Sequence, residues 1–254
     1  AGSKSQAERV VSQLDFPCII ASVIVEKGDG LEAAARKARY TALQKVAKER
    51  GAVAVLLGHT KDDQAETVLL GLARGSGARS LSGMATVNGI YIRPFLEITR
   101  KETEAACQEL GLQPWQDPYN EDLNFMRVRV RKKVLPMLES ELGPGISEAL
   151  TRSAQLLRDD ADALDELARA FWEEDQSLEV GALLKLSKAV RTRVLRIALL
   201  QAIRESGNHG TAQLSSEQVS QVEALVSNWK GQGEVSLPAG VKVSRISGRL
   251  TLSN

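Results

Sequence analysis

The sequence has few cysteines, histidines and aromatic residues, and it has no long hydrophobic run. Its 254 residues include two cysteines and two histidines, and aromatic side chains make up 4% of the chain. These numbers exclude a disulfide framework and a clustered cysteine–histidine zinc site. We interpret Cys18 and Cys107 as reduced and mostly buried. No apolar run approaches the roughly 18 residues of a membrane span, and residues 1–9 lack the apolar core of a signal peptide. The sequence therefore predicts a soluble, cytoplasmic protein that has no membrane partner.

The balance of charges limits the kinds of partner. Basic and acidic residues nearly cancel, with 33 lysines and arginines against 32 aspartates and glutamates, so the formal net charge is +1. This excludes a uniformly basic nucleic-acid-binding surface, and the few aromatic residues leave few platforms on which bases could stack. Any contact with RNA must therefore be local.

The order of predicted elements indicates an α/β fold followed by a helical part. Residues 18–25 and 52–57 read as apolar strands, and helical patterns follow each of them, which is typical of a parallel α/β sheet. Beyond Gly143-Pro144-Gly145, the pattern predicts a long amphipathic helix from Ile146, two further helices and three short closing strands. We therefore expect two domains, residues 1–143 with a parallel sheet and residues 144–254, which are mainly helical and end in a β-hairpin.

One turn carries most of the candidate chemistry. A buried strand ends at Gly58, which permits an abrupt exit, and the helix that follows begins with clustered carboxylates. At about 100° per residue these carboxylates share one sector at the helix N-terminus, where they would meet a ligand or a metal together. The alternative is that Thr60 caps the helix and the acids complement its dipole. The candidate residues of this turn are Gly58, His59, Asp62, Asp63 and Glu66.

Basic and glycine-rich segments flank the turn on both sides. Arg36, Arg39 and Tyr40 lie three and four residues apart on one predicted helix, where two guanidiniums could hold phosphate or carboxylate. Residues 127–133 contain five basic residues, and in a helix Arg127 and Arg131 would share a face, whereas in a strand all three arginines would align. Either segment could instead be a solvated surface. The loop Gly75-Ser76-Gly77 could offer backbone amides to an anion, or could simply end a helix.

The second half carries no obvious chemistry. Six of its basic residues are compatible with contacting an RNA backbone, and equally with a role in solubility. They are Arg191, Arg193, Arg196, Lys230, Lys242 and Arg245.

Together these segments carry a resemblance to a known family. The turn at residues 57–67 with the loop at residues 74–77 resembles the signature of the tRNA(Ile)-lysidine synthetases, which are PP-loop ATP pyrophosphatases. Supporting matches follow in the expected order at residues 31–40, 117–120 and 127–136, and the second half resembles the family's appended domain in its shorter form. The resemblance covers nearly the whole chain, strongly as far as Leu138.

The resemblance implies a reaction and a set of ligands. The expected reaction joins L-lysine to C2 of the wobble cytidine of isoleucine tRNA with a CAU anticodon, through an adenylated base, and uses ATP and Mg²⁺. The implied catalytic residues are Asp62, Asp63, Glu66, Arg127 and Arg131, with Asp63 and Glu66 as metal ligands. The implied nucleotide-binding residues are Gly58, His59, Gly75, Ser76, Gly77, Arg36 and Arg39.

One departure from the family and two rival functions accompany this expectation. The family's phosphate loop, Ser-Gly-Gly-x-Asp-Ser, does not occur in the sequence, and we expect it to lie upstream of Ala1. A related tRNA thiolation enzyme is the nearer rival, although such enzymes commonly use cysteines and neither cysteine here lies in a paired motif. A non-catalytic RNA-binding protein is the other rival. The oligomeric state stays open, with a homodimer as one alternative.

Overall fold

The computed structural model describes residues 2–14, 16–25, 31–75, 77–207 and 214–253. The chain forms two compact units, residues 1–158 and residues 159–254. The limit between them falls inside the helix α8 (Ile146–Asp175). The domain boundary proposed from the sequence, at Gly143-Pro144-Gly145, lies just before the first residue of that helix.

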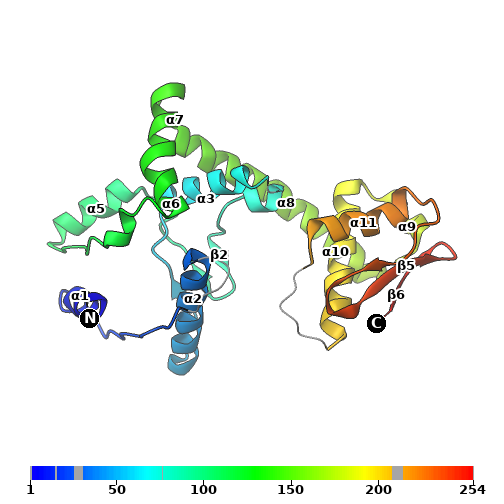
Figure 1. Cartoon of the computed structure of the whole chain (residues 1–254), viewed down its shortest axis with the longest axis horizontal. Coiled ribbons are helices and arrows are strands. Elements are labelled where there is room, and N and C mark those ends of the chain that lie inside the picture. Colours follow the sequence, from blue (N-terminus) through cyan, green and yellow to red (C-terminus); the bar gives the residue numbers. More distant parts are fainter. Residues whose placement is uncertain (1, 15, 26–30, 76, 208–213, 254) are drawn as a thin grey trace. The chain divides into compact units, whose positions relative to one another are not determined.

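Unit 1 is an α/β unit with short strands (Figure 1). Its elements before α8 are α1 (Gly2–Val11), α2 (Leu31–Arg50), β1 (Val55–Leu56), α3 (Lys61–Ala73), α4 (Ala78–Leu81), β2 (Val87–Asn88), β3 (Tyr91–Ile92), α5 (Arg100–Glu109), the 3₁₀ turn η1 (Pro118–Asn120), α6 (Met126–Arg129), the π-helical turn η2 (Val130–Val134) and α7 (Leu135–Leu142).

The sheet of unit 1 is smaller than the sequence predicts. β1 and β3 pair in parallel and β2 pairs with β3 antiparallel, so one parallel pair is present among the described residues. The predicted strand at residues 18–25 is wrong, because residues 17–25 form no strand and Ile24 is 88% exposed. A β-branched run favours extended backbone, but a strand also needs a neighbour for its ladder. Cys18 is exposed for the same reason, which corrects its expected burial, and both cysteines are free.

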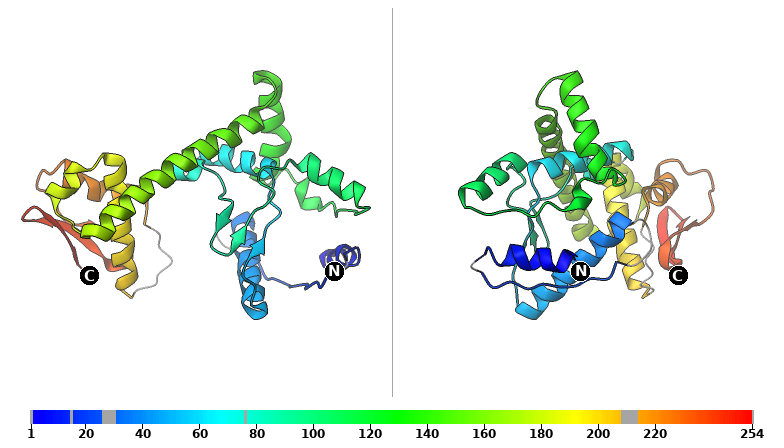
Figure 2. Two further views of the ribbon diagram at one scale, coloured as in Figure 1. Left: turned by 180° about the vertical axis from the view of Figure 1, so that it is seen from behind. Right: turned by 60° about the vertical axis from the view of Figure 1, so that its left-hand side comes forward.

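A small apolar contact joins α3 to the helical segment that carries Arg127 and Arg131. Ala65 on α3 is buried against Val130 and Leu135, and Leu150 of α8 packs on the same cluster. Two views show α3 beside the continuous α6–η2–α7 segment (Figures 1 and 2). This packing brings residues about sixty positions apart in sequence onto facing helices.

Unit 2 is a helical unit closed by an antiparallel sheet. Its core is built from α10 and α11 together with apolar residues of α8, α9 and the strands. Ser247 and Gly248 both have positive φ, which is the type I′ geometry of a two-residue hairpin turn, so the hairpin expected from the sequence is confirmed. Figure 2 shows α11 beside this sheet. The elements after α8 are α9 (Val180–Lys185), α10 (Lys188–Glu205), α11 (Ser216–Ser227), β4 (Val235–Ser236), the 3₁₀ turn η3 (Pro238–Gly240), β5 (Lys242–Ile246) and β6 (Arg249–Ser253).

Among the described residues, none of the helices combines the length and the apolar character that crossing a membrane requires.

Candidate active site

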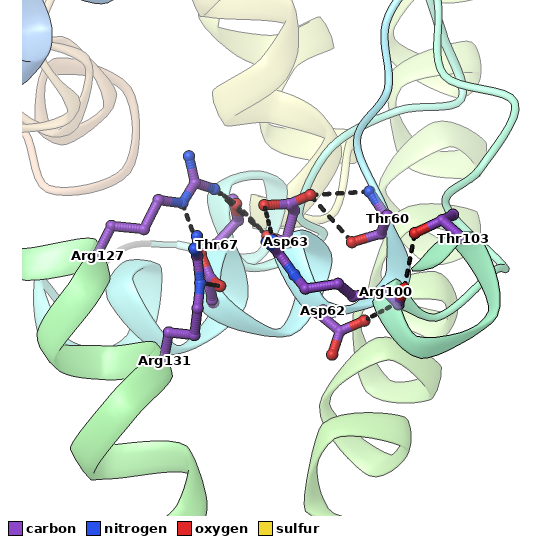
Figure 3. A network of polar contacts seen from close by, with 9 residues as sticks. Thr60, Asp62, Asp63, Thr67, Arg100, Thr103, Arg127 and Arg131 are labelled. Atoms are coloured by element: carbon purple, nitrogen blue, oxygen red, sulfur yellow. Dashed lines mark hydrogen bonds and ion pairs between the residues drawn. The ribbon is translucent and has the colours of Figure 1, made fainter. Parts of the chain in front are cut away.

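The turn from β1 into α3 is fixed by a capping box. Asp63 Oδ2 accepts hydrogen bonds from the backbone N–H of Thr60 at 2.9 Å and from its hydroxyl at 3.0 Å (Figure 3). The structural alternative raised by the sequence, capping of this helix, therefore applies to Asp63. It occupies only one of the two oxygens, however, and the other, Oδ1, lies 3.6 Å from Arg100 Nη2.

Asp62 has a different partner from its neighbour. Its Oδ2 accepts a hydrogen bond of 2.7 Å from the backbone N–H of Arg100, at the first residue of α5. Asp62 therefore ties the N-terminus of α5 to that of α3, and this tie places the Arg100 side chain near Asp63. No sequence pattern singled out Arg100, because its position depends on a contact that spans 38 residues.

Glu66 lies at the centre of the site. It is fully buried. Its Oε1 accepts from Arg131 Nε at 2.6 Å and its Oε2 from Arg127 Nε at 2.9 Å, with Arg131 Nη2 at 3.3 Å from Oε2. Arg127 Nη2 also donates to Thr67 Oγ1 at 2.6 Å. The spacing of four residues does place Arg127 and Arg131 on one helical face, and the helical alternative for residues 127–133 is confirmed.

The arginine pair has unused hydrogen-bonding capacity. Figure 3 shows one terminal nitrogen of Arg127 directed away from the network, with no bond drawn to it. The hydrogen bond to Glu66 raises the pKa of Arg131 and outweighs the opposing effect of burial, so this guanidinium stays charged. One buried carboxylate between two guanidiniums leaves a net positive charge of one. Such an arrangement presents preoriented N–H donors to an anion.

The charge states of Asp63 and His59 follow from their surroundings. Burial would raise the pKa of the Asp63 carboxyl, but the hydrogen bonds from Thr60 and the guanidinium of Arg100 together hold it below its usual 3.8. Burial lowers the pKa of His59 from 6.5 to about 4, and although Asp63 opposes this shift, Arg93 adds to it. At neutral pH Asp63 is therefore a carboxylate and His59 a neutral imidazole. His59 Nδ1 is buried without a hydrogen-bond partner among the described residues.

The carboxylates differ in how well they fit a metal. Both oxygens of Glu66 are engaged by guanidiniums, so a cation there would have to displace two charged donors. Asp63 keeps one oxygen, Oδ1, outside the capping box, and this oxygen lies 3.6 Å from Arg100 Nη2. Within the described ranges, no group of three histidine, cysteine, aspartate or glutamate side chains converges as a metal site. Mg²⁺ needs few protein ligands when phosphates supply the rest, so Asp63 fits such a site and Glu66 does not.

The arginines of α2 gather around a tyrosine. The Tyr40 hydroxyl accepts from Arg36 Nη2 and from Arg93 Nη2, each at 3.5 Å, and the Arg39 guanidinium carbon lies 5.9 Å from the ring centroid. Arg93 is buried, donates to the Ala85 carbonyl at 2.7 Å and leaves its Nε unpartnered among the described residues. No sequence pattern singles out Arg93, since an arginine before a proline at a strand end is not distinctive.

The glycine-rich loop behaves as a helix end. Gly75 follows the last turn of α3 with φ of +64°, which confirms its role in ending the helix, and Gly77 precedes α4. Ser76 lies outside the described residues. In the part of the chain that the structure describes, no hydrogen bond joins Gly58, Gly75 or Gly77 to the Glu66 network.

Comparison with known proteins accounts for both units. Residues 2–138 match the model of a PP-loop domain, and residues 178–251 match that of the TilS substrate binding domain. The tRNA(Ile)-lysidine synthase of Thermobifida fusca is 47% identical over 260 residues, which cover 99% of this chain and 79% of that protein. The chain belongs to the tRNA(Ile)-lysidine synthase family.

Other relatives agree with this assignment to the lysidine synthase family. The enzyme of the same name from Streptomyces coelicolor is 48% identical over 263 residues, which cover 99% of this chain and 73% of the relative. That from Mycobacterium tuberculosis is 44% identical over 256 residues, covering 96% and 76%. The PP-loop match spans every candidate residue of the turn and both arginines of the Glu66 network.

Proposed function

We propose that this protein joins lysine to C2 of the wobble cytidine of isoleucine tRNA with a CAU anticodon. In this reaction the cytidine O2 attacks the α-phosphate of ATP, pyrophosphate leaves, and the ε-amine of lysine then displaces AMP from the adenylated base. The observation that carries the proposal is the similarity to lysidine synthases over 99% of the chain. The substrates of this reaction would place it in the cytoplasm.

Arg127 and Arg131 are the proposed phosphate ligands. Negative charge on the α-phosphate and the departing pyrophosphate must be stabilised in the transition state, which fixed donors do well because they need no reorganisation. Glu66 supplies that fixation, since it orients both guanidiniums from a fully buried position. We therefore assign Glu66 to positioning the arginines. This assignment replaces its expected role as a metal ligand.

Asp63 is the proposed contact for the lysine ammonium or for Mg²⁺. When bound with ATP, Mg²⁺ would offset the charge of the phosphates. A carboxyl whose pKa is held below 3.8 is a weak base, so Asp63 is better suited to pairing with an ammonium than to removing its proton. Arg100 already places one cation near Asp63 Oδ1. Either incoming cation would compete with this guanidinium.

His59 and the α2 arginines are the proposed nucleotide contacts. A neutral imidazole with one unpartnered nitrogen can hydrogen-bond to a nucleotide, and its pKa of about 4 makes it a poor proton donor at neutral pH. Arg36 and Arg39 are proposed to contact phosphate. Gly58, Gly75, Ser76 and Gly77 remain proposed nucleotide-binding positions.

The direct test supplies ATP, radiolabelled lysine and an isoleucine tRNA transcript with a CAU anticodon. The 254-residue chain is assayed beside a longer form in which Ala1 is preceded by a segment containing the Ser-Gly-Gly-x-Asp-Ser loop, because the 254 residues contain no such sequence. We expect the longer form to release AMP and to label the tRNA with lysine. Sulfur incorporation would favour the thiolation enzyme, and tRNA binding without turnover would favour the non-catalytic RNA-binding protein.

A substitution at Arg127 tests the proposed phosphate contact. In the longer form, Arg127→Ala should lower kcat/KM roughly 100- to 1000-fold, the usual loss when one transition-state donor is removed. Arg127→Lys keeps the charge but loses the forked donors, so it should recover little activity. Arg129→Ala is the matched control, because this arginine lies on the same helix and, among the described residues, donates to the carbonyls of Leu123 and Asn124 and not to Glu66. Equal turnover by wild type and Arg127→Ala would contradict the assignment.

A further inference from the structure

The six basic residues that the sequence singled out in unit 2 have unequal roles. Arg191 is buried and donates from Nη2 to Glu223 at 2.7 Å, so it is a core ion pair. Lys242 pairs with Glu234 at 3.1 Å, and the Arg245 guanidinium lies 5.3 Å from the Trp229 ring centroid while donating to the Leu225 carbonyl. These three side chains already have structural partners.

Arg193 and Arg196 instead line a depression in the surface of unit 2. It has a volume of about 180 Å³ and lies between the C-terminal half of α8 and the middle of α10. A third guanidinium, that of Arg169, comes from α8. Its lining residues are Asp165, Arg169, Arg193, Arg196, Ile197 and Leu200.

The charges in this depression leave two cations for a ligand. Arg193 Nε donates to Asp165 Oδ1 at 2.6 Å, so these two charges offset one another. Arg169 is exposed, and Arg196 is exposed with one bond of 3.4 Å from Nη2 to the Leu214 carbonyl. Both guanidiniums therefore keep donors that face solvent. The combination of two such forks in a concave site is suited to a phosphate group.

The apolar part of the lining and the acidic residues nearby limit which kind of phosphate-bearing ligand fits the depression. Ile197 and Leu200 give the depression an apolar part, against which a ribose or a base can lie. Residues 159–175 of α8 carry eight acidic side chains and only one basic side chain, that of Arg169. A long RNA duplex laid across this helix would bring many phosphates against those acids. A single nucleotide that projects from the RNA would meet the arginines and avoid most of the acids.

We propose that this depression binds one unpaired nucleotide of the tRNA, with its phosphate held by Arg169 and Arg196 and its ribose or base covering Ile197 and Leu200. Splayed, unpaired nucleotides are the parts of RNA that proteins commonly recognise in this way. The proposal rests on the proposed function for the identity of the RNA. It assigns unit 2 a single local contact, which agrees with the nearly neutral charge of the whole chain.

The test measures the affinity for the isoleucine tRNA transcript as a function of salt concentration. The double variant Arg169→Ala/Arg196→Ala should bind roughly tenfold more weakly than wild type at moderate salt. Its salt dependence should fall by about one to two released counterions. Arg249→Ala, which removes an exposed arginine of β6 in the same unit, should stay within about twofold of wild type. Circular dichroism checks that each variant keeps its helices.

Competition by short RNAs tests whether the bound nucleotide is unpaired. A single-stranded oligonucleotide should compete with tRNA for wild type and much less for the double variant, whereas a duplex of the same sequence should compete equally weakly with both. Equal tRNA affinity and equal salt dependence for wild type and double variant would overturn the proposal, and so would a wild-type chain that does not bind tRNA. If the double variant binds tRNA more weakly but the longer form with the phosphate loop attaches no lysine, the depression is an RNA site and the proposed reaction is wrong.

Discussion

Glu66 is a fully buried carboxylate that forms ion pairs with two guanidiniums at once, so removing its charge leaves both guanidiniums without their buried partner. Glu66→Gln keeps the shape of the side chain but removes its charge, which leaves Arg127 and Arg131 as neighbouring cations. We expect the free energy of unfolding to fall by about 3 kcal/mol, as when one partner of a buried ion pair is lost. Urea denaturation followed by circular dichroism measures the loss.

The matched control is Glu49→Gln, at an exposed pair with Lys45 on α2. Exposed pairs of this kind contribute under about 1 kcal/mol. If both substitutions cost equally little, Glu66 does not hold the arginines in solution. Glu66→Gln should also lower the rate of AMP release, because arginines that move freely would bind phosphate less well. The loss of stability and the loss of rate should therefore appear together.

His59 should make the stability of the protein depend on pH. Its pKa is about 4 in the folded chain and 6.5 as the ordinary value, so the unfolded chain binds more protons between these two limits. The contribution of the neutral imidazole to the free energy of unfolding is therefore complete above pH 6.5 and is lost progressively as the pH falls toward 4. His59→Gln should flatten this part of the stability profile, measured by urea denaturation at a series of pH values. An unchanged slope would contradict the burial of the imidazole.

At the scale of elements, α3 is held to the loop before β2 by one glutamine. The Gln64 side chain donates to the Met84 carbonyl at 3.0 Å and accepts from the Met84 N–H at 2.7 Å. Gly83, the residue before Met84, has φ of +63°, and a Cβ there would approach Gln64 Oε1 to 2.6 Å. Only glycine satisfies both the backbone conformation and this close approach.

Gly83→Ala should therefore cost more than the backbone conformation alone explains. Gly89→Ala is the matched control, because Gly89 has φ of +59° and open space where the Cβ would lie. We expect about 1 kcal/mol of destabilisation for Gly89→Ala and about 3 kcal/mol for Gly83→Ala, since the second must also displace Gln64. Equal changes in the free energy of unfolding would show that Gln64 moves aside without cost.

The elements that the sequence predicted well are those determined by local interactions. At the start of α5, Thr99 and Glu102 form a capping box whose hydrogen bonds join residues three positions apart, so a Thr-x-x-Glu spacing is enough to indicate it. The strand predicted at residues 18–25 is wrong, because a strand depends on a partner elsewhere in the chain. The shared face of Arg127 and Arg131 was predictable from their spacing. Their common partner Glu66 was not, since 61 residues separate Arg127 from it.

At the scale of the whole molecule, the two units differ in how far the sequence pattern indicates the contacts that stabilise them. Unit 2 has a continuous core of buried apolar residues from α8, α9, α10, α11 and the closing strands. The sequence patterns predicted α8, α10, α11 and the strands, but not the short helix α9. Among the described residues, the buried cluster between α3 and the arginine-bearing segment consists of Ala65, Val130 and Leu135. The contact between α3 and this segment therefore depends more on the polar network around Glu66, and no periodicity in the sequence indicates that network.

The division of the chain leads to a last prediction about folding. The TilS substrate binding domain match begins at residue 178, but the core of unit 2 also includes Ala168 of α8, with Leu164, Phe171 and Trp172 packed on it. A fragment of residues 159–254 should unfold cooperatively in urea. A fragment of residues 178–254 should lose roughly 5 kcal/mol of apolar burial and unfold at much lower urea concentration, with a broad transition. Equal midpoints for the two fragments would mean that this half of α8 covers the core without stabilising it. A large difference would mean that the folding unit begins in α8, before the start of the matched domain at residue 178.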